Sequence, residues 1–284
     1  MKGTPSNSKV VLRQFVAQLS IDEPIDEKEA IARLLFEAEY GLSYSDVLAE
    51  KENIFDDGKL KEWAERINRH EPVQYIIGEA DFYGRKFEVS SSVLIPRPET
   101  EVLVREVLKT KITKPVILDV GTGSGCIAIT LSLEISGSLV HAMDVSEQAL
   151  AVAKENSKHH KTSIQFIKSD FLIEDITTAP LDILVSNPPY VRHLEKESMK
   201  SNVLSYEPHQ ALFVPDNDPL IFYRAIAKKG KALLKPGGRI FVEINAQLSS
   251  ETSHLFETEG YDDIHVIRDM DGKSRVITGC KPSN

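Results

Sequence analysis

Val116-Ile117-Leu118-Asp119-Val120-Gly121-Thr122-Gly123-Ser124-Gly125 is the stretch that decides the fold. Its first five residues form a short apolar run of the kind that becomes a buried strand. Alternate glycines follow, and residues 126–133 have the composition of a helix. The order of strand, glycine turn and helix is typical of the first unit of a doubly wound α/β sheet, where ligands bind at the carboxyl ends of the strands.

The glycines also indicate what this turn can do. Without a Cβ they let the backbone turn sharply and approach a ligand closely. The dinucleotide pattern G-x-G-x-x-G needs its third glycine at position 126, where this chain has Cys126, which speaks against a nucleotide-linked dehydrogenase. Asp144 ends the next predicted strand, about 20 residues downstream, where a carboxylate accepts hydrogen bonds from ribose hydroxyls. The two features predict an adenosine-bearing ligand, and the alternative is a turn that only packs strand on helix.

Strands and helices alternate beyond this loop. We expect strands at 139–144, 164–168, 183–185 and 240–242, and a helix from Glu147 to about Lys158. Apolar strands separated by helices predict a mostly parallel sheet covered on both faces. The lysines between Lys228 and Lys235 are expected to lie on a solvated helix face.

The N-terminal part has a different periodicity. Residues 8 to about 70 predict helices, because apolar residues recur at helical spacing. The first stripe is Leu12, Phe15, Val16 and Leu19, and a later helix carries Leu60, Trp63, Ala64 and Ile67. Asp26 and Glu29 are expected to form a capping box for a second helix. Residues 75–78 and 85–89 predict the two strands of a hairpin around Gly84. The predicted boundaries are a helical domain at 1–73, a hairpin connector at 74–95 and an α/β domain at 96–284.

Composition narrows the class of protein. The chain has 284 residues with 41% hydrophobic and 27% charged residues, and it contains no apolar run long enough for a membrane helix. Its start, residues 1–5, lacks the apolar core of a secretory signal. The two cysteines, Cys126 and Cys280, are far apart, which favours a protein of the reducing cytoplasm. They lack metal-ligand spacing, so we expect no metal site. The net charge of -9 argues against direct nucleic-acid binding and favours a protein partner or small substrate.

Asn187-Pro188-Pro189-Tyr190 follows the predicted strand at 181–186. The two prolines make a rigid exit from the sheet. An amide nitrogen is a poor nucleophile, because its lone pair is delocalised into the carbonyl. The Asn187 side-chain oxygen and the Pro188 carbonyl can accept hydrogen bonds from a substrate NH2 and aim its lone pair at a methyl donor. Tyr190 can supply an aromatic wall. The tetrapeptide predicts methylation of an amide or amine nitrogen, and the alternative is a strand-ending loop with incidental prolines.

Together, the glycine loop and the tetrapeptide resemble methyltransferases that act on planar NH2 groups of adenine, guanine or protein glutamine. Three further segments resemble the HemK/PrmC family of peptide-chain release factor glutamine-N5 methyltransferases. These segments are Leu94-Ile95-Pro96-Arg97-Pro98-Glu99-Thr100-Glu101, residues 71–78 continued by Phe82-Tyr83-Gly84, and residues 269–276. The resemblance covers essentially the whole chain.

The resemblance implies a doubly wound, seven-stranded Rossmann-like methyltransferase sheet, with an N-terminal helical bundle joined by a β-hairpin. It implies that the enzyme transfers a methyl group from S-adenosylmethionine to the glutamine side-chain nitrogen of the Gly-Gly-Gln motif, leaving S-adenosylhomocysteine. The helical domain would bind the release factor. We expect a cytoplasmic monomer that uses no metal and binds neither membrane nor nucleic acid directly.

The resemblance also assigns roles to residues. Those expected to contact the methionine part of the cofactor are Gly121, Thr122, Gly123, Ser124 and Gly125. Asp144 would bind the ribose hydroxyls, Asp170 and Phe171 would lie at the adenine, and Asn187 would lie between cofactor and substrate. Asn187, Pro188, Pro189 and Tyr190 would hold the glutamine amide.

Some positions allow more than one interpretation. The segment at 211–219 departs from the glycine-rich stretch usual in the family. Glu243 is either a second carboxylate of the site or a structural group. Arg97 either contacts the cofactor entrance or release factor, or forms a domain-linking ion pair. Cys126 is expected to be a packing residue.

Other functions remain as alternatives. The same chemistry on a ribosomal-protein glutamine would leave these motifs unchanged. A nucleic-acid amino-methyltransferase would need a basic target-recognition region or aromatic residues for a flipped base. A binding module without turnover would be expected to carry damage in one of the two motifs.

Overall fold

The computed structural model describes residues 5–283. Residues 1–4, which carry most of the prediction about a secretory signal, and residue 284 lie outside the described part. The chain divides into two compact units, residues 1–79 with 200–206, and residues 80–199 with 207–284.

The first unit is helical, as its apolar periodicity predicts. Its elements are α1 (Ser8–Val16), α2 (Ile25–Tyr40), α3 (Tyr44–Leu48), α4 (Asp57–Asn68), α5 (Val73–Ile77) and α9 (Ser201–Tyr206), with a short antiparallel pair of β1 (Ser6–Asn7) and β2 (Glu52–Asn53). The core contains Phe15, Phe36 and Trp63, and the rings of Phe15 and Trp63 meet edge to face with centroids 6.4 Å apart. The predicted stripe on the first helix is buried in this core.

Two local predictions in this region are wrong. The second helix begins at Ile25 after Pro24 and has no side-chain cap, so Asp26 lies inside its first turn instead of capping it. The capping box occurs one helix later, between Ser43 and Asp46.

Residues 75–78 form the end of a helix and its cap instead of a strand. Pro72 precedes α5, and Gly78 ends it in the left-handed conformation at a φ of 85°. These start and stop signals outweigh the strand preference of two adjacent isoleucines. The hairpin consists of β3 (Glu79–Phe82) and β4 (Arg85–Glu88), joined by a tight turn at Tyr83 and Gly84.

The second unit contains the seven-stranded sheet. Its strands are β5 (Val116–Val120), β6 (Leu139–Asp144), β7 (Ile164–Lys168), β8 (Leu181–Ser186), β11 (Leu234–Glu243), β12 (Asp262–Arg268) and β13 (Ser274–Cys280), in the order β12-β13-β11-β8-β5-β6-β7. β13 is antiparallel to both of its neighbours, and the other strands run parallel. The structure confirms the predicted doubly wound, Rossmann-like sheet.

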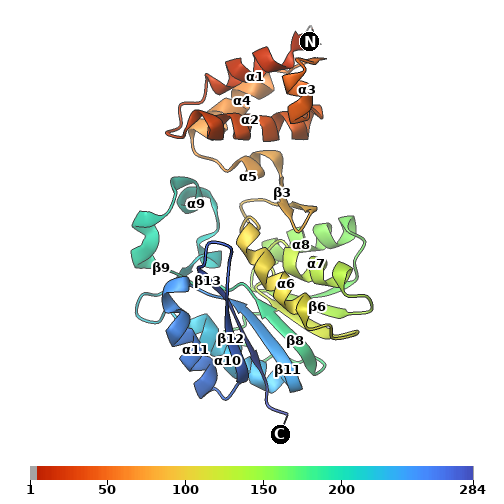
Figure 1. The fold of residues 1–284 in the computed structure, drawn as a ribbon, viewed down its shortest axis with the longest axis vertical. Coiled ribbons are helices and arrows are strands. Elements are labelled where there is room, and N and C mark those ends of the chain that lie inside the picture. The colour runs from red at the N-terminus through yellow and green to blue at the C-terminus, as the bar shows by residue number, and fades with distance from the viewer. Residues whose placement is uncertain (1–4, 284) are drawn as a thin grey trace. The chain divides into compact units, whose positions relative to one another are not determined.

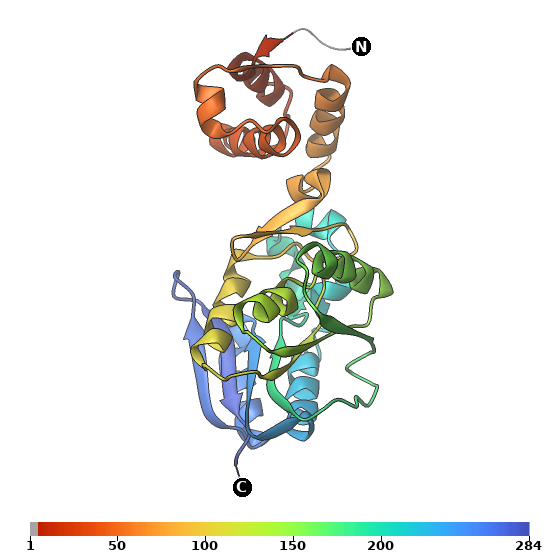
Figure 2. The same ribbon diagram turned by 90° about the vertical axis from the view of Figure 1, so that its right-hand side faces the viewer.

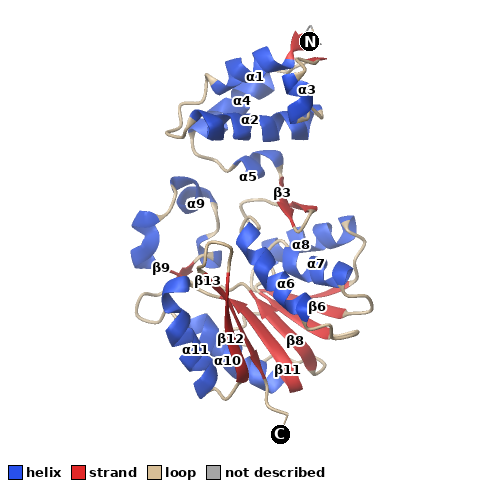
Figure 3. Cartoon of the chain, in the orientation of Figure 1, coloured by secondary structure: helices blue, strands red, loops and turns tan. Residues whose placement is uncertain are grey.

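Helices cover both faces of this sheet, as Figures 1–3 show. α6 (Glu101–Lys109) and α7 (Cys126–Glu134) pack on one face, with α8 (Glu147–His159) beside α7. α10 (Ile221–Leu233) and α11 (Ser249–Thr258) pack on the other. The shorter elements are η1 (Pro98–Thr100), β9 (Val191–Arg192), η2 (His193–Ser198), η3 (His209–Ala211), β10 (Phe213–Val214) and η4 (Ala246–Leu248).

The direction of winding reverses between β5 and β8. From β5 the chain adds β6 and β7 on one side, and then returns to place β8 on the other side of β5. The Ser186 hydroxyl donates a 2.7 Å hydrogen bond to the Val120 carbonyl and joins the carboxyl ends of these two strands. Such a reversal opens a crevice at the strand ends, and both predicted motifs leave the sheet there.

Among residues 5–283, no helix combines the length and apolarity needed to cross a membrane.

Candidate active site

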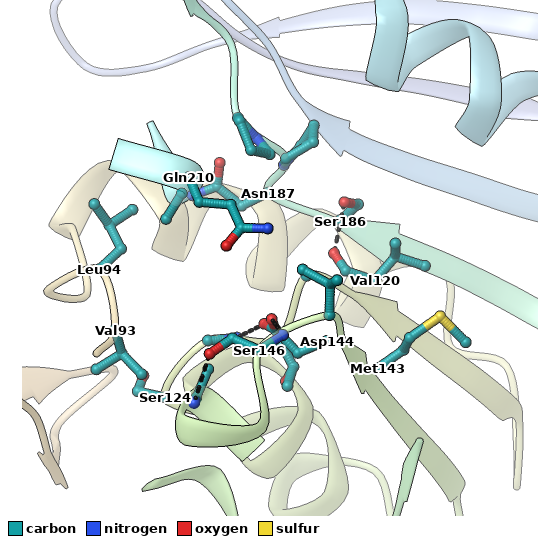
Figure 4. A pocket seen from close by; sticks show the side chains of 18 of the residues that line it. Val93, Leu94, Val120, Ser124, Met143, Asp144, Ser146, Ser186, Asn187 and Gln210 are labelled. Atoms are coloured by element: carbon teal, nitrogen blue, oxygen red, sulfur yellow. Dashed lines mark hydrogen bonds between the residues drawn. The ribbon is translucent and has the colours of Figure 1, made fainter. Parts of the chain in front are cut away.

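A cleft opens at the reversal point of the sheet, within the second unit. It encloses about 1270 Å³ of space, open solvent at its mouth included. Its lining comes from the loops after β5, β6, β7 and β8, from residues 92–97 and Thr100, and from residues 208 and 210–211. In the close view of Figure 4, Asn187 and Gln210 project from one side, and Asp144 and Ser146 lie on the opposite side.

The glycine loop forms one wall and is held by Asp144. The Asp144 carboxylate accepts hydrogen bonds from the backbone N–H groups of Gly123 and Ser146, both at 2.9 Å. Burial raises the pKa of Asp144, and these N–H donors oppose the shift. Each carboxylate oxygen keeps a lone pair for a further donor, such as a ribose hydroxyl. Gly123 has a φ of 55°, and a Cβ at that position would meet no atom within 4 Å, so the backbone here is open to a ligand.

Asp119 supports the loop from beneath. It is fully buried in β5 and accepts a 2.7 Å hydrogen bond from the Thr122 hydroxyl, while its other oxygen has no partner among the described residues. Burial raises the pKa of Asp119 to about 7. Burial also raises the pKa of the Cys126 thiol to about 12, which agrees with a packing role for that residue.

Phe171 and Asp170 follow β7 and line the same cleft. The Lys229 ammonium lies 5.4 Å from the centre of the Phe171 ring and donates 2.7 Å hydrogen bonds to the carbonyls of Phe171 and Glu174. Lys229 therefore fastens this segment to α10. The prediction that the lysines of this helix only face solvent is wrong for Lys229, and it is also wrong for Lys231, which donates to the carbonyls of Glu259 and Gly260.

Asn187 is connected to two buried side chains. Its Nδ2 donates to Thr100 Oγ1 at 3.1 Å, and Thr100 Oγ1 donates to Glu243 Oε2 at 2.7 Å. The Tyr190 hydroxyl donates to the other Glu243 oxygen at 3.1 Å. Burial raises the pKa of Glu243, while its two donors and the nearby Arg275 oppose that shift. Glu243 thus joins the two ends of the Asn187–Tyr190 segment.

Arg97 and Glu207 bring two parts of the cleft entrance together. Arg97 Nη2 lies 2.6 Å from Glu207 Oε1, and the Ile95 N–H donates to Glu207 Oε2 at 3.3 Å. Both residues belong to the second unit, so this is not a domain-linking ion pair. Arg97 also lines the cleft.

The segment that departs from the family pattern is also ordered by contacts in this unit. Phe213 and Val214 form β10, which pairs in parallel with β9. The Asp216 side chain accepts a 3.0 Å hydrogen bond from Leu194 N–H, and both Asp218 oxygens accept 3.0 Å bonds from Arg224. These polar contacts fix the loop without the glycines that are usual there.

Most of the predicted site residues meet in the cleft. Those that line it are Gly121, Thr122, Gly123, Ser124, Asp144, Asp170, Phe171, Asn187, Pro188 and Pro189. Among the described residues, Gly125 and Tyr190 do not line the cleft. Gly125 lies against Ala153 of α8, and the Tyr190 hydroxyl points to Glu243.

The sequence reading missed four side chains of this site, namely Thr100, Gln210, Lys229 and the Glu207 partner of Arg97. Thr100 and Glu207 had a sequence signal, because Thr100 lies in the entry segment at 94–101 and Glu207 lies just before the segment at 211–219. The described residues contain no group of three or more His, Cys, Asp or Glu that could hold a metal ion.

Comparisons with known proteins agree with this geometry. The Methyltransferase small domain model matches residues 98–212, and the PrmC N-terminal domain model matches residues 11–78. A release factor glutamine methyltransferase from Bacteroides thetaiotaomicron is 42% identical over 90% of this chain and 93% of its own length. The protein of that name from Flavobacterium psychrophilum is 39% identical over 93% of this chain and 95% of its own. The crystal structure of a methyltransferase from Pyrococcus furiosus covers 78% of this chain and 98% of its own, with a TM-score of 0.54 and 18% sequence identity. This similarity shows a shared fold.

Proposed function

This chain belongs to the family of release factor glutamine methyltransferases, and we propose that it methylates the side-chain amide nitrogen of the Gly-Gly-Gln glutamine in a peptide-chain release factor. It is an S-adenosylmethionine-dependent methyltransferase by its domain and its relatives. The observation that carries the choice of an amide substrate is the position of Asn187, which lies in the cleft opposite Asp144 and donates its own NH2 group to Thr100, so that its oxygen is left to accept from a substrate.

The cleft suits the cofactor. The open backbone at Gly121 and Gly123 would receive its methionine part, the Asp144 carboxylate its ribose hydroxyls, and the Phe171 ring its adenine. When bound, S-adenosylmethionine supplies a methyl group on a positively charged sulfur, which makes that carbon an electrophile.

The Asn187–Tyr190 segment would hold the nucleophile. The Asn187 Oδ1 and Pro188 carbonyl oxygens would accept the two N–H bonds of the substrate amide, which turns the nitrogen lone pair toward the methyl group. The nitrogen gains positive charge as the N–C bond forms, and these two acceptors stabilise that charge. The extra proton can then leave to water, so no general base is required before transfer.

We further propose that the helical unit recognises the release factor. Tyr44 and Leu48 are spaced i, i+4 on α3 and are more than half exposed, at 56% and 53%. Replacing both by Ser should raise the KM for the release factor about 10-fold and leave S-adenosylmethionine affinity unchanged. Ile173→Ser, which alters an exposed apolar residue of the other unit, is the matched control.

The substrate proposal is tested with labelled S-adenosylmethionine, purified release factor and a release factor with Gly-Gly-Ala in place of Gly-Gly-Gln. Label in the first factor and none in the second is the expected result. Label only in a ribosomal protein or a nucleic acid, offered in parallel, would contradict the proposal. Asn187→Ala should abolish transfer and keep cofactor affinity within a few-fold. We also propose a cytoplasmic monomer, which sedimentation analysis of the purified chain would test for its oligomeric state.

A further inference from the structure

We infer that Thr100 and Glu243 are positioning residues that fix which way round the Asn187 amide lies, and that they thereby present its oxygen to the substrate. This inference rests on the proposed function of Asn187 as the acceptor for the substrate amide. It concerns two residues that act through Asn187.

The first step counts protons. As a carboxylate, Glu243 is an acceptor only, and each of its oxygens takes one hydroxyl donor, from Thr100 and from Tyr190. A threonine hydroxyl has a single proton. Because Thr100 gives that proton to Glu243, it can only accept from Asn187. The Asn187 atom that faces Thr100 is therefore its NH2 group, and Oδ1 is the atom left for the cleft.

The second step concerns burial, which makes the arrangement costly to reverse. Glu243 is 1% exposed and Thr100 is 3% exposed, so little water reaches either side chain. If Asn187 turned over, Thr100 would have to donate to Asn187 Oδ1, and one Glu243 oxygen would lose its donor. An unsatisfied buried acceptor, charged in this case, is strongly disfavoured.

The third step concerns the groups around Glu243. Burial raises the Glu243 pKa, and Glu99, next to Thr100, adds to that shift, whereas the Thr100 and Tyr190 hydroxyls and Arg275 on β13 oppose it. The hydroxyl of Tyr223 on α10 accepts a 2.9 Å hydrogen bond from the backbone N–H of Asn245. The carboxylate therefore has Thr100 and Tyr190 as its hydrogen-bond donors among the described residues.

The consequence is orientational. With Oδ1 in the cleft, Asn187 can accept an N–H of the substrate amide. The reversed amide would place its own NH2 against the NH2 of the substrate, two donors facing each other, and the nitrogen lone pair would no longer be aimed. Loss of the hydrogen bonds from Asn187 through Thr100 to Glu243 should therefore reduce kcat, while the cofactor site is left intact.

The chain offers matched variants for the test. Thr100→Val removes the hydroxyl at nearly constant volume, and Thr100→Ser restores it. Thr130 on α7 is also fully buried, but its hydroxyl has no partner among the described residues, so Thr130→Val controls for the same chemical change. Kinetics with the release factor should show kcat about 10- to 100-fold lower in Thr100→Val. Thr100→Ser and Thr130→Val should stay within about 3-fold of the parent chain, and S-adenosylmethionine affinity should change less than about 3-fold in all of them.

Glu243→Gln is the second arm of the experiment. A glutamine at 243 has a single acceptor oxygen, so it cannot accept from Thr100 and Tyr190 at separate oxygens. Where its NH2 group faces Thr100, the Thr100 proton is free for Asn187 Oδ1 and the amide turns over. We expect kcat to fall at least about 10-fold in this variant. Parent kcat in Glu243→Gln, together with unmoved Asn187 NH2 resonances, would show that the Glu243 charge is not needed to orient the amide.

Two readouts separate this inference from the proposed function. If the parent chain does not label the Gly-Gly-Gln factor, the proposed function fails. The orientation is then read from the Asn187 side-chain NH2 resonances in 15N NMR spectra, assigned by their loss in Asn187→Asp. These resonances should move in Thr100→Val and stay in Thr100→Ser and Thr130→Val. Unchanged resonances in Thr100→Val, or equal losses of kcat in Thr100→Val and Thr100→Ser, would overturn the inference.

Discussion

The Arg97 guanidinium lies 2.6 Å from the Glu207 carboxylate, and the Glu207 side chain is 1% exposed while that of Arg97 is 34% exposed. The pair joins the entry segment at 94–97 to the segment that begins at Glu207, and residues of both line the cleft. It thus connects stretches more than a hundred residues apart in the chain.

Removing Arg97 should destabilise the second unit. Arg97→Met leaves the buried Glu207 carboxylate with only the Ile95 N–H, and we expect the free energy of unfolding to fall by about 2 kcal/mol. Lys168→Met breaks an exposed pair with Glu147 and should cost less than about 0.5 kcal/mol. Chemical denaturation measures both, and equal stability of the two variants would contradict a structural role for the buried pair.

Asp144→Asn should raise the Kd for S-adenosylmethionine, with a smaller effect on the free energy of unfolding. The amide keeps the shape but has one oxygen where the carboxylate has two, so it cannot accept from Gly123, Ser146 and a ribose together. We expect the Kd for S-adenosylmethionine to rise about 10- to 100-fold, equivalent to about 1.4–2.8 kcal/mol. Isothermal titration calorimetry measures this, with Glu147→Gln on the exposed start of α8 as control. An unaltered Kd would exclude Asp144 from the cofactor site.

Lys229→Met should loosen the wall that carries Phe171. The variant loses two hydrogen bonds to backbone carbonyls and the contact with the ring. We expect S-adenosylmethionine affinity to fall about 5-fold, or about 1 kcal/mol. The neighbouring Lys228 is exposed, and Lys228→Met should bind the cofactor like the parent chain. If the two variants bind equally well, the Lys229 contacts do not shape the site.

Asp119 predicts a pH dependence of stability. Burial raises the pKa of Asp119 to about 7 in the folded chain, so its stabilising contribution is complete below about pH 4 and is lost as the pH rises through 7. Asp119→Asn stays neutral. The free energy of unfolding of Asp119→Asn minus that of the parent chain should therefore rise by about 3 kcal/mol from pH 4 to pH 8. Urea denaturation at several pH values measures this, and a difference that does not vary with pH would show that Asp119 is not buried as an acid.

Local signals in the sequence were enough for much of the fold. The apolar runs of β5, β6 and β7 and the glycine loop are short-range features, and their predicted positions agree with the structure. The same holds for most helices. The wrong element predictions, at Asp26 and at residues 75–78, fall where a proline or glycine signal competes with another local signal.

The sequence by itself determined the class of sheet, the two motifs at the strand ends, and the family, because each of these depends on residues that are neighbours in the chain. Only the tertiary structure decided which side chains support the motifs. Thr100, Glu243 and Asn187 come from η1, the end of β11 and the end of β8, and Arg97 meets Glu207 across more than a hundred residues. Such contacts depend on how the strands are ordered in the sheet and on which buried groups need partners. No spacing along the chain encodes either.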